Sequence, residues 1–327
     1  MSILVYCEVS EGRLSTISTE ILGGGRELAN ALGSGLSAVL ISKDAGLLAQ
    51  EAISFGADTV YVIDDSLLSD YQAEVHLEAM ERLVKLISPK VLIFGQTDVG
   101  RDLAPRLAFR LGTSAVLGCT ELAVDDQTKL LLQTRPIYGG NAHAVFTTIT
   151  DPQVVTIKAK SMLPLEEDPS RKGDVIHIEG NMDVSILRTR LIQRVKEVEG
   201  IKLDDARVIV SGGRGISGKD GFTKLEKIAA ILKGAVGASR PPCDSGWIPS
   251  GKQIGLTGKV VAPDLYIAVA ISGSTHHMSG CAGSKTIVAI NKDIEANIFR
   301  QAHFGVVGDW MKVLTGFEIK IKEIIVE

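Results

Sequence analysis

The chain has 327 residues, of which 45% are hydrophobic and 23% are charged. This length exceeds the usual size of a single hydrophobic core, so it favours two domains. Lys and Arg total 35 against 39 Asp and Glu, a formal net charge of −4, which indicates no basic surface for nucleic acid or an anionic membrane.

Cysteine usage and hydropathy restrict the class of protein further. The four cysteines are scattered and form no close C-x-x-C pair, which favours reduced thiols over a disulfide framework or a zinc site. The chain shows neither a signal-peptide pattern nor the run of about 18 apolar residues that a membrane helix needs. We therefore expect a cytoplasmic protein without a membrane span.

Strand and helix patterns alternate through the first hundred residues. Helices with one apolar face are predicted within 17–32, 75–86 and 103–111, because apolar residues recur there at helical spacing. Short apolar runs typical of buried strands occur at 3–7, 37–41, 59–63 and 91–94. This alternation predicts a parallel sheet covered by helices.

The pattern changes after residue 120. Residues 121–157 are rich in strand formers with turns between them, which predicts added antiparallel strands. Residues 161–174, with their prolines and charges, are typical of a connector, and a helix pattern follows over 186–200. The interpretation is an N-terminal α/β domain over 1–195 and a second domain over 196–327.

The second domain has the pattern of a doubly wound α/β fold. A helix is predicted at 223–232 and another near 309–314. Strands are predicted at 206–211, 266–271, 286–290 and 306–307. About five parallel strands are typical of such domains.

Two loops that follow predicted strands have the composition of a phosphate-binding site. Gly212 to Gly215 is a glycine-rich turn around Arg214, and residues 272–283 combine glycines and hydroxyl side chains with an adjacent pair of histidines. Glycines let a phosphate approach the backbone, and open α/β sheets bind ligands beyond the carboxyl ends of their strands. Both loops are therefore candidate ligand-binding segments.

Three segments of the second domain together resemble, in their order and spacing, the FAD-binding domain of the α subunit of electron transfer flavoprotein. They are the loop at 212–215, the segment GASRPPCDSGWIPSGKQIGLTGK (237–259) and the stretch 265–291. The resemblance covers nearly the whole chain. It is densest from 206 to 314 and includes TRPIYGGNA (134–142) and GRDLAPRLAFRLG (100–112). It implies FAD as the cofactor, bound on the second domain.

The resemblance also implies roles for single residues. Arg240 matches an arginine against the isoalloxazine ring, where a fixed cation stabilises the anionic reduced flavin. His277 matches a histidine that donates to the pyrimidine carbonyl, and Thr257 matches a hydroxyl near N5. Asn291 and Asp309 match contacts at the adenosine end. The full expected set is Arg214, Ser239, Arg240, Gly255, Leu256, Thr257, Ser272, Gly273, Ser274, Thr275, His276, His277, Asn291 and Asp309.

Three features depart from the family pattern. His276 stands where relatives have Gln, Ser274 and Thr275 stand where they have small or apolar residues, and Leu256 replaces a frequently polar residue. The changes beside His277 leave the flavin potential open. No nearby Cys or carboxylate completes a metal site with the adjacent histidines, so none is expected.

The sequence shows no catalytic triad, nucleophile elbow or Walker lysine loop. The resemblance therefore implies an electron carrier without substrate chemistry of its own. Its N-terminal domain would contact a β subunit in a heterodimer. Electrons would come from a flavin dehydrogenase, such as an acyl-CoA dehydrogenase, and leave to a quinone oxidoreductase or another acceptor.

Two other functions stay open at this stage. The chain could be the α subunit of an electron-bifurcating complex that oxidises NADH and reduces ferredoxin or flavodoxin, in which case it would be part of an oxidoreductase. Alternatively, it could be a nucleotide-binding module without a redox role. NADH reactivity distinguishes the first alternative, and bound flavin the second.

Overall fold

A computed structural model of the protein describes residues 2–10, 12–140, 142–193, 201–203 and 205–325. By its internal contacts the chain divides into Met1–Arg194, the N-terminal unit, and Val195–Glu327, the C-terminal unit. The predicted boundary at 195 lies among residues outside the described ranges.

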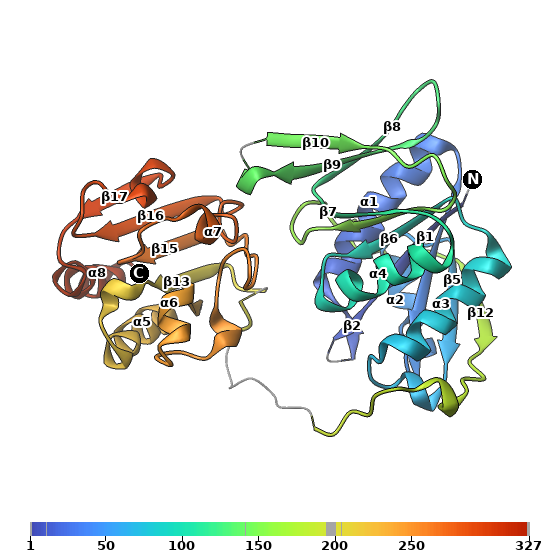
Figure 1. Cartoon of the computed structure of the whole chain (residues 1–327), viewed down its shortest axis with the longest axis horizontal. Coiled ribbons are helices and arrows are strands. Elements are labelled where there is room, and N and C mark those ends of the chain that lie inside the picture. Colours follow the sequence, from blue (N-terminus) through green and yellow to red (C-terminus); the bar gives the residue numbers. More distant parts are fainter. Residues whose placement is uncertain (1, 11, 141, 194–200, 204, 326–327) are drawn as a thin grey trace. The chain divides into compact units, whose positions relative to one another are not determined.

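The N-terminal unit is built on a seven-stranded parallel sheet (Figure 1). Its interior strands are buried on both faces, which explains their continuous apolar sequence. Across the sheet their order is β12 (Asp174–Glu179), β5 (Thr59–Asp64), β4 (Gly35–Ile41), β1 (Ser2–Cys7), β6 (Val91–Gly95), β11 (Gln153–Ile157) and β7 (Ala115–Cys119).

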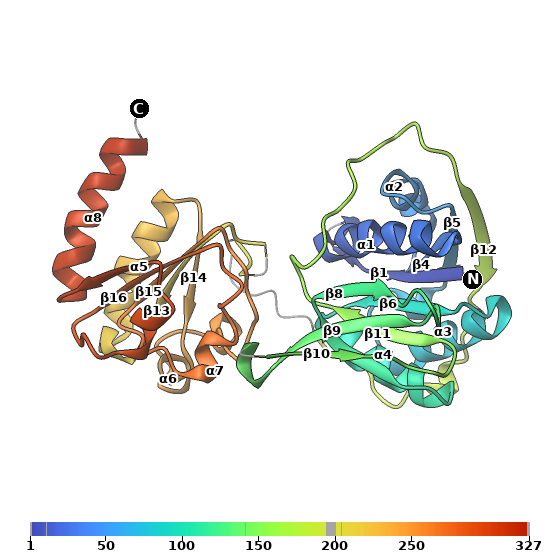
Figure 2. The same cartoon turned by 90° about the horizontal axis from the view of Figure 1, so that it is seen from above.

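Helices cover both faces of this sheet (Figure 2). On one face α1 (Thr16–Leu32) and α2 (Ala49–Ser54) pack with alternate strand residues such as Ile3 and Val5. On the other face α3 (Ala73–Ile87) and α4 (Asp98–Arg110) pack with the remaining residues, such as Leu4. The predicted helix-covered parallel sheet is confirmed.

The antiparallel prediction for 121–157 is correct for most of that segment. Three of its strands form an antiparallel sheet: β8 (Glu121–Val124), β9 (Leu131–Ile137) and β10 (Ala142–Phe146). A separate short antiparallel pair, β2 (Val9–Ser10) and β3 (Arg13–Leu14), lies near the start of the chain. The last predicted strand, β11, instead inserts between β6 and β7 in the parallel sheet. Its five fully buried residues need cover on both faces, which the central position supplies.

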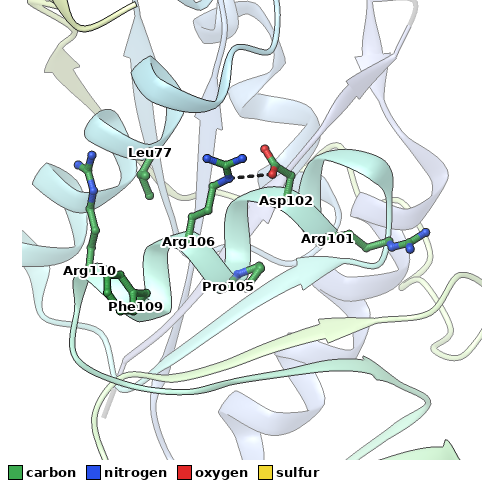
Figure 3. A pocket seen from close by; sticks show the side chains of 7 residues that line it. All are labelled: Leu77, Arg101, Asp102, Pro105, Arg106, Phe109 and Arg110. Carbon is green, nitrogen blue, oxygen red and sulfur yellow. Dashed lines mark hydrogen bonds and ion pairs between the residues drawn. The ribbon is translucent and has the colours of Figure 1, made fainter. Parts of the chain in front are cut away.

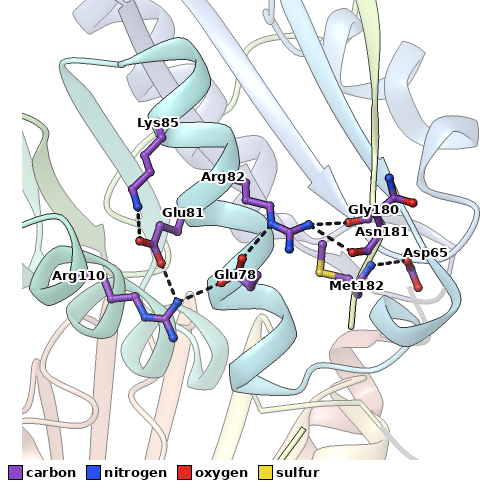
Figure 4. A network of polar contacts seen from close by, with 9 residues as sticks. All are labelled: Asp65, Glu78, Glu81, Arg82, Lys85, Arg110, Gly180, Asn181 and Met182. Carbon is purple, nitrogen blue, oxygen red and sulfur yellow. Dashed lines mark hydrogen bonds and ion pairs between the residues drawn. The ribbon is translucent and has the colours of Figure 1, made fainter. Parts of the chain in front are cut away.

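No sequence pattern predicted β12, the edge strand beside β5. Ionic and backbone contacts hold its end against α3 (Figure 4). Arg82 pairs with Glu78 at 2.8 Å and donates to the carbonyl oxygens of Gly180 and Asn181, each at 3.3 Å. The predicted helix over 186–200 is wrong for 187–193, which have no helical structure, and its remainder lies outside the described residues.

The C-terminal unit has five parallel strands in the order β14 (Ala235–Ala238), β13 (Val208–Gly212), β15 (Leu265–Val269), β16 (Thr286–Asn291) and β17 (Phe304–Val307). In chain order this is 2-1-3-4-5, the doubly wound arrangement whose order reverses between β13 and β15. The predicted fold class is confirmed.

Different elements cover the two faces of this second sheet. α5 (Lys219–Ile231) and α8 (Trp310–Ile325) pack on one face through Phe222, Leu225 and Leu314. On the other face, α7 (Thr275–Met278) and the segment containing Ile254 pack against Tyr266. The remaining helix, α6 (Arg240–Asp244), follows β14.

Candidate functional site

The carboxyl ends of the five parallel strands place the predicted residues along one edge of the C-terminal sheet. Gly212 pairs in register with both Ala238 and Val269, and Asn291 pairs with Val307. The chain leaves each strand close to these residues. Arg214 follows β13, Ser239 and Arg240 follow β14, the stretch from Ser272 to His277 follows β15, Asn291 ends β16, and Asp309 follows β17.

At the point where the strand order reverses, the loops after β13 and β15 touch. The Gly213 amide donates to the Val269 carbonyl at 2.8 Å. A Cβ atom on Gly213 would lie 2.1 Å from the carbonyl oxygen of Ala270, so only glycine fits there. This contact fixes Arg214, whose side chain is exposed, beside the crevice where doubly wound sheets bind ligands.

The loop after β15 carries a run of free backbone donors. None of the amide groups of residues 271–276 donates a hydrogen bond to any described residue, whereas the amides of Ala270 and His277 on either side do. Gly273 adopts a left-handed conformation with φ of 80°. Consecutive unpaired amides around such a residue form a concave anion site, so this loop fits the pyrophosphate of a dinucleotide.

The segment Gly255 to Thr257 joins this edge by packing on α7. The Leu256 amide donates to the His276 carbonyl at 2.7 Å. A Cβ on Gly280 would come within 2.3 Å of the Gly255 nitrogen, so the two backbones are in contact. Leu256 is 59% exposed, and the Thr257 hydroxyl accepts from the Gln253 amide at 3.0 Å. An apolar surface and a hydroxyl are thus presented beside His276.

The two adjacent histidines have opposite environments. His276 is exposed, whereas His277 is 5% exposed. The Nδ1 atom of His277 lies 3.1 Å from the Ile254 carbonyl oxygen and its Nε2 atom 3.0 Å from the Tyr266 hydroxyl. Because a carbonyl can only accept, Nδ1 carries the proton and Nε2 accepts from Tyr266. Burial lowers the pKa of His277 to about 4, so the ring is neutral near pH 7.

This arrangement changes the expectation for His277. With one ring nitrogen donating to Ile254 and the other accepting from Tyr266, the imidazole has no proton left for a flavin carbonyl. The predicted contact requires the ring to exchange one of these partners. Sequence reasoning missed Tyr266, which is fully buried, because its residue type and spacing suit an ordinary core strand.

Ser239 and Arg240 lie at the end of β14. The Ser239 amide donates to the Gly212 carbonyl at 3.0 Å, and its side chain is buried. The Arg240 side chain is two-thirds exposed and pairs with Asp244 at 3.1 Å. The sequence reasoning did not consider Asp244, which partly neutralises the guanidinium expected to face the ring.

Asn291 and Asp309 both have structural partners. Asn291 donates from Nδ2 to the Ile271 carbonyl at 2.9 Å, which ties β16 to the loop after β15. Asp309 accepts from the amides of Met311 and Lys312 at 3.0 and 3.1 Å, so it caps the first turn of α8. Their expected contacts with adenosine stay predictions.

A surface depression on the N-terminal unit has a different character (Figure 3). Arg106 pairs there with Asp102 at 2.7 Å beside the exposed ring of Phe109. The lining residues are Leu77, Arg101, Asp102, Pro105, Arg106, Phe109 and Arg110. None of the residues predicted to bind the cofactor lines it.

No helix among the described residues has the length and apolarity needed to cross a bilayer. Within the same residues, no three His, Cys, Asp or Glu side chains are grouped to hold a metal ion.

Comparison with known proteins gives matches along nearly the whole chain. Residues 3–181 match the family model of the electron transfer flavoprotein domain, and residues 202–282 match that of the electron transfer flavoprotein FAD-binding domain. Electron transfer flavoprotein subunit alpha of Thermoanaerobacterium thermosaccharolyticum is 44% identical over 98% of both chains. The protein of the same name from Megasphaera elsdenii is 42% identical over 95% of this chain and 94% of its own length. Protein FixB of Clostridium saccharobutylicum is 36% identical over 98% and 96%, respectively.

Proposed function

The chain belongs to the α-subunit family of electron transfer flavoproteins, and from this premise we propose that it binds FAD at the carboxyl edge of the C-terminal sheet and transfers electrons between partner proteins. The observation that carries the proposal is the run of amides at 271–276 that donate to no described residue, beside the crevice between β13 and β15. That site offers backbone donors and Arg214 to a pyrophosphate.

The other predicted residues are assigned by their position along the edge. The isoalloxazine ring would lie among Ser239, Arg240, Gly255, Leu256, Thr257, His276 and His277. The amides and side chains of Ser272, Gly273, Ser274 and Thr275 would hold the pyrophosphate with Arg214, and Asn291 and Asp309 would lie toward the adenosine.

FAD supplies reversible one- and two-electron transfer when bound. The chain's own contribution is positioning and electrostatics. Arg240 would place positive charge near the ring and so favour its reduction, although pairing with Asp244 weakens this field. The neutral His277 would contribute no net charge, and it would hold the backbone of Ile254 through its own hydrogen bond.

The physiological partners follow from the family. The chain would form a heterodimer with a β subunit, and its N-terminal unit would supply the contact surface. A flavin dehydrogenase, such as an acyl-CoA dehydrogenase, would donate electrons, and a quinone oxidoreductase would accept them.

A second candidate is the α subunit of an electron-bifurcating complex that uses NADH and reduces ferredoxin or flavodoxin. It shares with simple electron transfer the matched FAD-binding domain and the proposed FAD site. Family membership disfavours the third possibility, a nucleotide-binding module without a redox role.

A first experiment co-purifies the chain with its β subunit and records anaerobic visible spectra during stepwise addition of NADH and, separately, dithionite. One flavin per heterodimer, reduced by dithionite and not by NADH, supports simple electron transfer. Two flavins with rapid reduction by NADH would instead support bifurcation, and absence of flavin would contradict both.

The binding edge is tested by Arg214→Ala, which should lower the FAD content and weaken FAD binding. Lys227→Ala is the matched control, because Lys227 is also an exposed cation of this unit and lies on α5. Equal FAD affinity in the wild type and both variants would remove Arg214 from the site.

A further inference from the structure

The segment TRPIYGGNA, which contains Arg135 on β9, has no part in the proposed flavin site. In the N-terminal unit Arg135 lies near the carboxyl ends of three parallel strands. Thr120, next to the last residue of β7, donates its amide to the Thr134 carbonyl at 2.9 Å, and the Lys158 amide, just past β11, donates to the Cys119 carbonyl at 2.9 Å. These bonds bring the backbones beside Arg135 and Lys158 to opposite sides of the end of β7.

Lys158 and Gln96 converge above Gly118 of β7. Gln96 follows β6, and its amide donates to the Ile157 carbonyl at 2.7 Å. A Cβ atom on Gly118 would lie 3.6 Å from Cε of Lys158 and 3.8 Å from Nε2 of Gln96. The ammonium-bearing end of the lysine and the amide nitrogen are therefore neighbours.

These donors lack acceptors in the described part of the chain. Nε of Arg135 is buried without a hydrogen-bond partner. No ion pair of Arg135 or Lys158 with a described carboxylate is found, and Gln96 uses its oxygen to accept from Thr156 while its nitrogen donates to no described residue. The cluster thus presents two cations and an amide donor, and no described carboxylate is paired with them.

The charge balance supports the same conclusion. Burial and then the charge of Arg135 lower the pKa of Lys158, and no carboxylate raises it. Gln133, two residues before Arg135 on the same face of β9, is fully buried, and neither polar atom of its side-chain amide has a partner. Buried polar groups are normally hydrogen-bonded, so the side-chain amide of Gln133 is also available to hydrogen-bond with a ligand or with a water molecule bound to it.

We propose that Arg135, Lys158 and Gln96 form an oxyanion-binding site at the ends of β6, β7 and β11, in which a carboxylate or phosphate group bridges the two cations. A guanidinium presents parallel N–H groups that match the two oxygens of such a group. The oxyanion comes either from a small molecule or from an acidic side chain of the β subunit. Its recognition is independent of FAD binding at the other sheet.

The test uses the full chain loaded with FAD, so that phosphate cannot occupy the proposed flavin site. Equilibrium dialysis with labelled inorganic phosphate, at constant ionic strength, should show one bound phosphate that Lys158→Met weakens by at least about tenfold. Lys172→Met removes an exposed lysine from the same unit and should have no effect. Arg214→Ala should leave this phosphate in place even if it impairs FAD binding, which separates the two sites.

A second arm distinguishes the sources of the oxyanion and repeats the measurements with the β subunit present. Phosphate retained in the heterodimer indicates a small-molecule anion. Phosphate excluded from the heterodimer, or a loss of β-subunit affinity in Lys158→Met of about tenfold, indicates a carboxylate of the partner. If Lys158→Met changes neither phosphate binding nor β-subunit affinity, while circular dichroism shows an intact fold, the proposal is wrong.

Discussion

The two units use the same kind of parallel sheet but treat the reversal of strand order differently. In the N-terminal unit the order reverses between β1 and β6, where Glu8 accepts from the Thr97 hydroxyl at 2.6 Å and uses its own amide to donate to Ser18 at 2.7 Å. In the C-terminal unit the corresponding loop leaves the amides of 271–276 without acceptors among the described residues. Topology provides a crevice in both units: a carboxyl side chain lies at the first, and a run of six consecutive amides that donate to no described residue lies at the second.

Charge reinforces this difference. The pKa of Glu8 is raised to about 7, mainly by burial; the Thr97 hydrogen bond opposes this rise, and the charge of Asp98 adds to it. A carboxyl group in that crevice disfavours a phosphate. Arg214 occupies the corresponding place beside the C-terminal crevice.

The largest expected effect comes from breaking the contact between the loops after β13 and β15. Gly213→Ala places a Cβ against the Ala270 carbonyl, which lies 2.1 Å from its ideal position. We expect the C-terminal unit to lose about 3 kcal/mol of unfolding free energy and most of its FAD, as measured by urea unfolding and bound-flavin absorbance. Gly316→Ala, where a Cβ meets nothing within 4 Å, is the control, and equal stability of the two variants would contradict the close contact.

The next largest effect concerns Glu8, whose side chain lies at the crevice of the N-terminal unit. Because the folded pKa of Glu8 is about 7 against an ordinary value of 4.5, its contribution to stability is complete below about pH 4.5 and is lost as pH rises through 7. Glu8→Gln keeps an acceptor for Thr97 and should stabilise the unit at pH 8 by about 2 kcal/mol relative to the wild type.

Urea unfolding at pH 4.5 and pH 8 measures this prediction for Glu8. The difference between variant and wild type should be larger at the higher pH. Glu27→Gln, at an exposed position of α1, is the control for the substitution itself. A constant difference for Glu8→Gln would mean that the Glu8 pKa is ordinary.

A smaller effect tests the buried pair in the C-terminal unit. Tyr266→Phe removes the hydroxyl that donates to Nε2 of His277 at 3.0 Å and leaves a buried acceptor unpaired, which should cost about 1 kcal/mol. Chemical denaturation of the C-terminal unit measures it. Tyr61→Phe, in the N-terminal unit, should leave this transition unchanged, and an unaltered transition in Tyr266→Phe would show that the hydrogen bond contributes nothing.

The smallest effect compares two exposed arginines, one at the carboxyl edge of the C-terminal sheet and one at the opposite edge. Arg240→Ala should lower the flavin reduction potential by roughly 30 mV, because an exposed guanidinium paired with Asp244 exerts a screened field. Spectroelectrochemical titration measures this shift. Arg207→Ala removes a similar pair with Asp264 just before β13, away from the carboxyl edge; a shift of equal size there would mean that proximity to the ring is not responsible.

Local patterns were sufficient for most of the fold. The strands predicted at 3–7 and 286–290 correspond to β1 and β16. A continuous apolar run suits a strand in a sheet that is covered on both faces, so the pattern was enough to predict them. β14 and β12 were missed for different reasons. β14 is the four-residue sequence AVGA, too short for a clear pattern, and β12 is an edge strand with mostly exposed residues, so its pairing depends on the distant strand β5.

The sequence by itself determined the two α/β units, the family resemblance and the loops in which candidate cofactor residues lie, because each depends on residue types at short spacing. Tertiary structure decided which side chains in those loops are free. It paired His277 with Tyr266 and Ile254, left its neighbour His276 exposed, and brought Arg135 close enough to Lys158 to lower its pKa, with no described carboxylate paired to either. Such hydrogen bonds and charges depend on segments that meet only after the sheets assemble, so no local pattern contains them.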